Sequence, residues 1–449
     1  MYRIKVATEK DKYELGELTK MFLPASAFEM TFEDSAVGPF DLTIAEDGSK
    51  DDRKRLLYGF LKEQTGKDLD WGILTGVRPG KLYNDLFRSL GREEAERRLR
   101  SDSYVSPEKL HLLSQVHFVQ EELFMDRDPH AVGIYVGIPF CPTRCSYCSF
   151  TSNPIKGDAA IRYLNALLTE IEAVACIMKE QGLYAESVYI GGGTPTSLID
   201  SEFEKLLQAV TSSFITEKTR EFSVEAGRPD TITGSKLALI SKYGAGRISI
   251  NPQSMKQHTL DLIGRSHTPE EILQAFGLAK QAGIPIINAD LITGLPEEEP
   301  EDFKNTLDQV IALDPENITV HTLAVKKGSR LIESDEEYNY KHGQVVAQML
   351  SYAEAALTKA GYKPYYLYRQ KHMAGNFENV GWCKNGTPSI YNIRIMEDDQ
   401  TIIAMGAGAM TKVFYPNENR LERVPNVSNY EIYIERIQEM IQRKKDGIL

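Results

Sequence analysis

The chain has 449 residues, of which 42% are hydrophobic and 26% charged, and its formal net charge at pH 7 is −12. That length predicts about three domains with a buried core. The negative charge argues against a broad nucleic-acid surface, which requires a basic stripe. Charged residues occur throughout the first thirty positions, and no apolar run approaches the roughly 18 residues of a membrane span. We therefore expect a cytoplasmic protein with no secretion signal, no membrane span and no nucleic-acid partner.

Residues 1–128 are interpreted as an N-terminal α+β accessory domain. The segment from Trp71 to Lys81 is rich in glycine and proline, and its Arg78 and Lys81 could reach an acidic ligand, although exposed basic side chains usually bind nothing specific. Local patterns predict strands at 4–7 and 40–45 and helices at 51–64, 92–100 and 106–126.

From residue 129 to residue 332 the sequence alternates between strand-like and helix-like segments, which is typical of parallel β/α units. Ser201 to Glu204 and Thr268 to Glu271 match capping boxes that begin later helices. Six strands are expected, at 133–138, 187–190, 221–225, 247–251, 286–292 and 317–322. Six units are too few for a closed eight-fold barrel, so the predicted fold class is α/β, with an open, partial (β/α)6 barrel.

Residues 333–449 are interpreted as a C-terminal α/β cap over the barrel mouth. The segment from Tyr365 to Lys371 mixes aromatic and basic side chains, which would suit a flat ring that carries carboxylates, although tyrosine-rich strands often serve packing alone. Patterns in this part predict a helix at 339–360, strands at 362–368, 390–396, 401–405 and 411–415, and a final helix at 427–443.

Three of the five cysteines lie on one short loop behind the first barrel strand. Pro139 ends that strand, and Cys141, Cys145 and Cys148 follow with a C-x3-C-x2-C spacing. Three thiolates can hold three irons of a cubane cluster and leave the fourth iron open for a cofactor. Structural zinc usually takes four paired ligands, and disulfides need an oxidising compartment, so both alternatives fit this loop less well.

The ends of the later strands carry further candidate groups, and in β/α barrels function gathers at these carboxyl ends. Gly191-Gly-Gly-Thr-Pro195 lets a ligand approach the backbone closely, or is a simple tight turn. Glu225 ends the third strand, and Arg265 offers a planar fork for a carboxylate, unless it forms a surface pair. Asp290 lies in an apolar strand and needs a partner, or caps the next turn.

The cysteine loop after a Tyr-Val-x-Ile-Pro-Phe strand resembles the radical S-adenosylmethionine (SAM) enzymes of the oxygen-independent coproporphyrinogen III oxidase family. Within that family the pattern is similar to the HemZ-type coproporphyrinogen dehydrogenase branch. The resemblance runs from about residue 70 to about residue 415 and also includes Trp71-Gly-Ile-Leu-Thr-Gly-Val-Arg-Pro79, Glu225-Ala-Gly-Arg-Pro-Asp230 and Asn251-Pro-Gln253.

The resemblance implies a 4Fe-4S cluster bound by the three cysteines and one SAM or two. The first SAM would be lined by Tyr135, Gly192, Glu225 and Met410. The positions that match a second SAM are Tyr147, Gly193, Thr194, Gln253, Arg265, Asp290 and Ala324. An external reductant such as flavodoxin or ferredoxin would supply the electron that splits SAM.

By the same resemblance, a 5′-deoxyadenosyl radical would abstract hydrogen from propionate side chains and convert coproporphyrinogen III to protoporphyrinogen IX by oxidative decarboxylation. We expect a tetrapyrrole substrate to meet basic groups at the barrel mouth. His321, on the sixth strand, is either a functional group or a neutral core histidine. The candidate basic groups are Arg78, Lys81, Lys326, Arg330, Arg369 and Lys371.

Some positions depart from the family's pattern. Decarboxylases of this group usually have histidine where Gly137 stands and often a fourth cysteine where Phe150 stands, and their N-terminal Pro-Arg-Tyr-Thr arm has no counterpart in this chain. These departures concern the substrate and leave the cluster ligands in place. Two alternatives therefore stay open: a haem chaperone, and a radical SAM methyltransferase or haem-opening enzyme.

Overall fold

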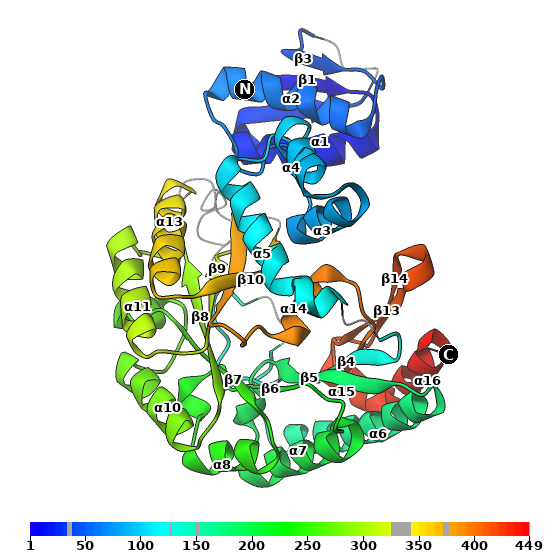
Figure 1. Cartoon of the computed structure of the whole chain (residues 1–449), viewed down its shortest axis with the longest axis vertical. Helices are drawn as coiled ribbons and strands as arrows, with labels where there is room; N and C mark the ends of the chain where they lie inside the picture. Colours follow the sequence, from blue (N-terminus) through cyan, green and yellow to red (C-terminus); the bar gives the residue numbers. More distant parts are fainter. Residues whose placement is uncertain (34–37, 126–127, 149–151, 325–342, 371–376, 449) are drawn as a thin grey trace.

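The computed structural model describes residues 1–33, 38–125, 128–148, 152–324, 343–370 and 377–448. One sheet of 11 strands runs through the larger part of the molecule, and a separate sheet of 3 strands lies at the N-terminal end (Figure 1). None of the helices in these ranges is long and apolar enough to cross a membrane.

The six central strands of the large sheet are parallel, and each pairs with the next strand in the sequence. They are β4 (Ala131–Ile138), β5 (Tyr184–Gly192), β6 (Glu221–Glu225), β7 (Arg247–Gln253), β8 (Ile286–Thr293) and β9 (Asn317–Thr322). Five intervening helices form the outer rim (Figure 1): α6 (Ala159–Glu180), α7 (Asp200–Phe214), α8 (Gly234–Lys242), α10 (Pro269–Gln281) and α11 (Pro300–Ala312). A short helix, α9 (Gln257–Leu262), lies between β7 and α10 in the sequence. This arrangement confirms the predicted partial (β/α)6 barrel.

The alternation of side chains along these strands decides what faces the inside of the barrel. On β4, Ile134 and Val136 are fully buried in the hydrophobic core, and Tyr135 between them lines a cavity. On β8, Ala289 is likewise in the core and Asp290 lines the cavity. Polar residues at alternate positions of an otherwise apolar strand therefore mark the inner wall.

The C-terminal segment extends the barrel sheet at both edges. At one edge β11 (Glu378–Cys383) pairs antiparallel with β9, and β10 (Lys363–Arg369) pairs antiparallel with β11. At the other edge β12 (Ile402–Met405) pairs parallel with β4, followed by antiparallel β13 (Met410–Tyr415) and β14 (Arg420–Pro425). Helix α13 (Gly343–Lys359) packs on α11.

Residues 390–396, predicted as a strand, form helix α14 (Ile390–Glu397), so that prediction is wrong. The run is rich in isoleucine, but Ser389 caps it by accepting a hydrogen bond from the backbone N–H of Asn392. The carboxylate of Glu221, at the start of β6, accepts the backbone N–H groups of Ile390 at 2.9 Å and Tyr391 at 3.2 Å. A carboxylate from a distant strand thus stabilises the helix N-terminus.

Two other local predictions need correction. The predicted final helix is two helices, α15 (Tyr430–Glu435) and α16 (Ile437–Ile448), which are separated at Arg436. Helix α7 begins after Ile199 without a side-chain cap, and Ser201 binds the adjacent Glu202 instead of forming a capping box. The capping box at Thr268 is confirmed.

The N-terminal sheet has its own hydrophobic core. Its parallel strands are β1 (Tyr2–Val6), β2 (Phe28–Thr31) and β3 (Leu42–Ile44), and they pack with helices α1 (Glu9–Phe22) and α2 (Lys50–Thr65). Helices α3 (Pro79–Leu90), α4 (Arg92–Ser101) and α5 (Pro107–Met125) instead contribute side chains to the barrel core. The division at 1–128, 129–332 and 333–449 stays a proposal, and the packing favours an independent N-terminal unit that is shorter than the first of these ranges.

Candidate functional site

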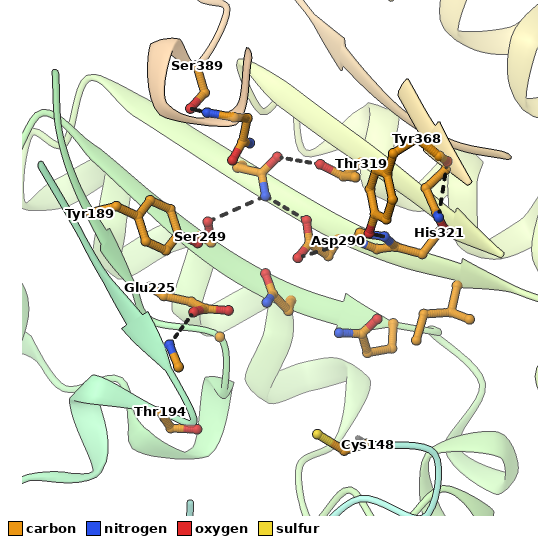
Figure 2. A pocket seen from close by; sticks show the side chains of 18 of the residues that line it. Cys148, Tyr189, Thr194, Glu225, Ser249, Asp290, Thr319, His321, Tyr368 and Ser389 are labelled. Carbon is orange, nitrogen blue, oxygen red and sulfur yellow. Dashed lines mark hydrogen bonds and ion pairs between the residues drawn. The ribbon is translucent and has the colours of Figure 1, made fainter. Parts of the chain in front are cut away.

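A cavity of about 470 Å³ lies inside the open barrel. Its walls come from all six parallel strands, the cysteine loop, β10 and α14. Figure 2 shows Glu225 and Asp290 facing the same space, with Cys148 on one side and Tyr368 on the other. This volume falls within the range that accommodates a drug-sized ligand.

The cysteine loop is held by its own backbone hydrogen bonds. Cys141 donates its N–H to the carbonyl of Asn153 at 3.1 Å, and Asn153 donates to the carbonyl of Pro139 at 2.9 Å. The N–H of Cys148 donates to the carbonyl of Cys145 at 3.3 Å. All three thiols are partly exposed and line the cavity.

Two polar side chains approach these sulfur atoms. Thr194 Oγ1 donates to Cys141 Sγ at 3.4 Å, and Arg228 Nη1 lies 3.9 Å from Cys145 Sγ. Arg228 is 3% exposed and is fixed by Asp230 at 2.9 Å. Burial and the neighbouring thiols raise the pKa of Cys141, although the Thr194 hydrogen bond opposes this. The nearby guanidinium would favour the thiolate form that binds metal.

Among the described residues, no three His, Cys, Asp or Glu side chains converge as ligands of one metal ion. A cubane cluster needs a different arrangement of ligands, because each of its irons binds a single thiolate from the protein. The donor set here, three thiols from one loop, fits that demand.

The glycine turn after β5 leaves no room for side chains. A Cβ on Gly193 would lie 2.5 Å from the carbonyl oxygen of Phe140 and 3.0 Å from Cys141 Sγ. Gly192 has a φ of +110°, and a Cβ on Gly191 would lie 2.7 Å from a carboxylate oxygen of Glu225. Backbone therefore packs directly against the cysteine loop at Gly193, and the close approach of a ligand to this glycine run stays a prediction.

Glu225 lies at the end of β6, where its half-buried side chain lines the cavity. It accepts the N–H of Gly192 at 3.2 Å. Burial, followed by the negative charge of Asp290, raises its pKa to about 8, whereas the Gly192 N–H and Arg265 act in the opposite direction. The carboxyl group is therefore mostly protonated at neutral pH, and a bound cation such as an ammonium group would favour its ionised form.

Arg265 is 8% exposed, so the alternative of a surface ion pair is wrong. It donates to the carbonyl of Gly227 at 3.0 Å and to the hydroxyl of Tyr147 at 3.1 Å, while its Nε has no partner among the described residues. Asn251 Oδ1 and Gln253 Oε1, both buried, also have no partner within the described ranges. Buried polar atoms left unpaired are costly, so they indicate a place where a ligand completes the bonding.

Gln253 also has a strained backbone. Its φ is +67°, a left-handed conformation that non-glycine residues rarely adopt. Such strain persists where the surroundings enforce it and concentrates at ligand sites.

Asp290 faces the cavity with fixed partners. Asn288 Nδ2 donates to Asp290 Oδ1 at 2.7 Å, and His321 Nε2 lies 3.7 Å from Oδ2. The hydroxyl of Tyr368 extends this row of polar contacts, because it lies 3.4 Å from His321 Nδ1 (Figure 2). Burial by itself raises the pKa of Asp290, but contacts with His321, Asn288 and Thr319 outweigh it and lower the pKa.

Tyrosines form the wall opposite the cysteine loop. Tyr189 stacks on Tyr391 with ring centroids 4.7 Å apart, and Tyr135 stacks at 6.3 Å from Tyr189. Tyr366 and Tyr368, from β10, stack at 6.3 Å. These rings form two stacked groups, one from β4, β5 and α14 and one from β10, and both line the cavity.

The structure brings together nearly all the predicted cofactor residues. Met410 is the exception, because it begins β13 with 40% exposure and does not line the cavity. The lining residues are Tyr135, Cys141, Cys145, Tyr147, Cys148, Gly192, Gly193, Thr194, Glu225, Gln253, Arg265, Asp290 and Ala324.

Of the predicted basic groups, the three that lie within the described residues do not line this cavity. Arg78 pairs with Asp398, and Lys81 lies 3.6 Å from Asp85. Arg369 is buried and donates to the carbonyl of Leu74 at 2.6 Å. Lys326, Arg330, Lys371 and Phe150 lie outside the described residues.

Sequence reasoning gave no role to several residues that line the cavity. The lining includes Arg228, Arg247, Ser249, Asn288, Thr319 and Tyr391. Most occupy inward positions on the strands, so extending the two-residue alternation along each strand would have identified them.

Comparisons with known proteins agree with this geometry. Residues 135–310 match the family model described as the Radical SAM superfamily. Over 390 residues the chain is 41% identical to the oxygen-independent coproporphyrinogen-III oxidase-like protein HemZ of Bacillus subtilis, covering 86% of this chain and 78% of that protein. It is 28% identical to the heme chaperone HemW of Escherichia coli, covering 64% of this chain and 71% of the chaperone.

A solved structure shows the same fold. The coproporphyrinogen III oxidase HemN of Escherichia coli, described as a radical SAM enzyme, matches with a TM-score of 0.56. The match covers 72% of each chain at 23% sequence identity.

Proposed function

Because the chain belongs to the oxygen-independent coproporphyrinogen-III oxidase-like family of radical SAM proteins, we propose that it decarboxylates coproporphyrinogen III oxidatively to protoporphyrinogen IX. Two propionate groups would each become a vinyl group, with loss of carbon dioxide, one hydrogen atom and one electron. SAM, when bound, would supply the group that takes up the hydrogen atom, and the electron would pass to an external one-electron acceptor. A flavodoxin or ferredoxin in the cytoplasm would act as reductant.

The observation that carries this proposal is the convergence of three thiols, a glycine turn without side chains and the half-buried carboxyl group of Glu225 on one cavity. Family membership implies a 4Fe-4S cluster and SAM, and the donor set fits both. Cys141, Cys145 and Cys148 would hold the cluster. When bound, the cluster and SAM supply the hydrogen-abstracting chemistry.

The chain itself would bind and orient the cofactor's amino acid part. The backbone at Gly192 and Gly193 allows close approach, and Glu225 can pair with an ammonium group. Tyr135 is partly exposed to the cavity, and its ring stacks on Tyr189 with centroids 6.3 Å apart, which helps to exclude water from this side. Water exclusion strengthens each of these electrostatic contacts.

A second SAM has weaker support than the first. Gln253 and Arg265 offer unpaired atoms to a ligand, and Tyr147, Gly193, Thr194 and Ala324 lie on the same cavity wall. Asp290, in contrast, already has partners on both carboxylate oxygens. We propose one SAM per chain as the minimum.

A haem chaperone is the second candidate, favoured by the similarity to HemW and by Gly137. A Cβ on Gly137 would lie 3.2 Å from the Tyr135 ring, so a larger residue there would have to displace that ring. This chain therefore lacks the side chain that decarboxylases of the family usually place beside the cavity.

The deciding experiment is an anaerobic incubation of the reduced, cluster-loaded protein with SAM and coproporphyrinogen III. Mass spectrometry of the porphyrins and quantification of 5′-deoxyadenosine give the readout. We expect loss of two carboxyl groups per tetrapyrrole, with deoxyadenosine formed in proportion.

Background deoxyadenosine together with about one haem retained per chain would overturn the decarboxylase in favour of the chaperone. A mass gain of one methyl group would instead indicate a methyltransferase. An opened haem ring would indicate a haem-degrading enzyme.

A further inference from the structure

Arg228 lies beside the cysteine loop, in the segment that follows β6. It is 3% exposed and lines the cavity. Through Nη1, its guanidinium group donates to Cys145 Sγ at 3.9 Å and to Thr143 Oγ1 at 3.0 Å. The proposed binding of SAM does not use this arginine, so its contact with a predicted cluster ligand needs a separate explanation.

The other nitrogen atoms of Arg228 contact a carboxylate. Nε and Nη2 each donate to one carboxylate oxygen of Asp230, both at 2.9 Å, and such a two-pronged pair fixes the plane of the guanidinium group. Ser266 Oγ accepts from Arg228 Nη2 at 2.8 Å and donates to Asp230 Oδ2 at 3.0 Å. Burial by itself raises the pKa of Asp230, but the contacts with Arg228 and Ser266 outweigh it and lower the pKa, so this carboxylate is ionised at neutral pH.

These contacts order two opposite charges relative to the cysteine loop. The guanidinium group is always protonated and touches the sulfur atom of Cys145, and Asp230 contacts other nitrogen atoms of the same group. Reduction adds one negative charge to an iron–sulfur cluster, and the reduction potential depends on the nearby charge and on hydrogen bonds to the sulfur atoms. A positively charged donor at Cys145 would therefore stabilise the reduced form, and Asp230 would oppose this effect.

Arg265, the second buried guanidinium group on this cavity, has different partners. It donates to the hydroxyl of Tyr147 at 3.1 Å and to the carbonyls of Gly227 at 3.0 Å and Asn251 at 3.3 Å. These acceptors are oxygen atoms of uncharged groups, whereas Arg228 donates to a thiol. Arg228 is therefore the arginine whose position suits an effect on the cluster.

We propose that Arg228 sets the reduction potential of the cluster through its contact with Cys145, and that Asp230 fixes the guanidinium group and moderates its effect. The proposal rests on the cluster of the proposed function and does not depend on the tetrapyrrole. A higher potential would let a weaker one-electron donor reduce the cluster.

A purely structural role of Arg228 predicts a different result. The arginine would then hold the cysteine loop through Thr143, which also donates to the carbonyl of Gly264 at 3.1 Å. Loss of either partner of the ion pair would loosen the loop in the same way. If charge acts on the cluster, loss of Arg228 and loss of the Asp230 charge shift the potential in opposite directions, so the sign of the shift separates the two roles.

The test is an anaerobic redox titration of the full-length, cluster-loaded protein without SAM or tetrapyrrole. Electron paramagnetic resonance measures the reduced cluster, and iron analysis of each sample measures cluster loading. The variants are Arg228→Gln, Asp230→Asn and the double variant that carries both substitutions. Arg162→Gln is the matched control, because Arg162 also pairs with an aspartate, Asp158 at 3.1 Å, but both of these side chains are more than half exposed.

We expect Arg228→Gln to shift the one-electron equilibrium about tenfold toward the oxidised cluster, which corresponds to a potential lower by about 59 mV. Asp230→Asn keeps the guanidinium group and removes the opposing charge, so it should shift the equilibrium about threefold toward the reduced cluster. The double variant loses both charges and should lie between Arg228→Gln and the wild type. Arg162→Gln should change the equilibrium by less than about twofold, because exposed charges are screened.

Shifts in the same direction in Arg228→Gln and Asp230→Asn would overturn the proposal, and so would an unchanged potential in fully loaded Arg228→Gln. If Arg228→Gln binds no cluster, Asp230→Asn decides, because it keeps the arginine. A higher potential in Asp230→Asn then supports the proposal, and an unchanged or lower potential rejects it.

This experiment and the test of the proposed function can fail independently. Decarboxylation by the wild type together with an unchanged potential in Arg228→Gln would reject this inference alone. The expected opposite shifts together with no decarboxylation by the wild type would reject the proposed function alone.

Discussion

Two buried polar regions of this chain complete their hydrogen bonds in different ways. Between α6 and the C-terminal helices, Glu170 accepts from the N–H of Gly406 at 2.8 Å, from Asn426 at 2.9 Å, from Tyr433 at 2.5 Å and from Lys444 at 2.5 Å. Glu170 and Lys444 are both 0% exposed. In this cluster the protein itself provides every bond that the carboxylate needs.

The cavity presents the opposite pattern. Asn251 Oδ1, Gln253 Oε1 and Arg265 Nε are buried and have no partner in the part of the chain that the structure describes. A region with complete internal bonding stabilises the fold, whereas a region with unpaired atoms is organised for a ligand. Substitutions in the first region should therefore change stability, and substitutions in the second should change binding.

The largest expected effect is on the cluster itself. Cys145→Ala should reduce reconstituted iron from about four per chain to near background, because three thiolates are the minimum for a site-differentiated cubane. Cys176→Ala, at an exposed cysteine on α6, should keep full iron content. Iron analysis and the absorbance of the reducible cluster are measured for both variants. A full cluster in Cys145→Ala would show that Cys145 is not a cluster ligand.

Next in size is the stability of the Glu170 cluster. Lys444→Met leaves the buried Glu170 carboxylate without its cation, which typically costs about 3–5 kcal/mol of unfolding free energy. Lys445→Met, at the exposed neighbouring lysine, should change it by less than about 0.5 kcal/mol. Urea unfolding of both variants is the measurement. Equal stabilities would show that this cluster is not a structural support.

Arg265 should show the converse behaviour. Arg265→Lys keeps the charge but loses the planar fork that contacts Gly227 and Tyr147, so SAM affinity should fall about tenfold. The iron content of Arg265→Lys should stay unchanged. The control is Arg162→Lys, at an exposed arginine that pairs with Asp158, and its affinity for SAM should equal that of the wild type. Isothermal titration with SAM tests this. An affinity within twofold of wild type would place Arg265 outside the SAM site.

The last effect is a slope with pH, and per pH unit it is no larger than the effect expected at Arg265. The folded chain holds the Glu225 proton up to about pH 8, whereas the unfolded chain releases it near the usual value of 4.5. Stability is therefore lost as pH rises between these values, by at most about 1.4 kcal/mol per pH unit. Glu225→Gln should flatten this slope in urea unfolding of the ligand-free protein at pH 6, 7 and 8. Parallel profiles for the two proteins would contradict the raised pKa.

Strand patterns predicted the barrel well because the side-chain period of a strand is a local property. Asp290 was identified by its position on an apolar strand and Tyr135 by the family resemblance, and both line the cavity. The two-residue period places Asn288 and Asp290 on one face of β8, but it could not show that His321 from β9 and Tyr368 from β10 would join them.

Helix α14 shows where local propensity fails. Its isoleucines favour a strand, but Glu221, 169 residues from Ile390, binds the N–H groups at the helix start. Basic residues failed for a related reason. Arg78 forms an ion pair with Asp398, and Arg369 donates a hydrogen bond to the carbonyl of Leu74. No local pattern specifies the distant partner of a long, flexible side chain.

The sequence by itself determined the six-unit barrel and the cysteine spacing, since both depend on short-range periodicity and on residues a few positions apart. It also placed Gly192 and Glu225 at strand ends, which in a parallel sheet share one edge. Only the tertiary structure decided which polar atoms stay unpaired. The tyrosine wall, the fixed carboxylate of Asp290 and the paired state of Glu170 arise from contacts between segments far apart in the chain, and burial in a common core sets their energies.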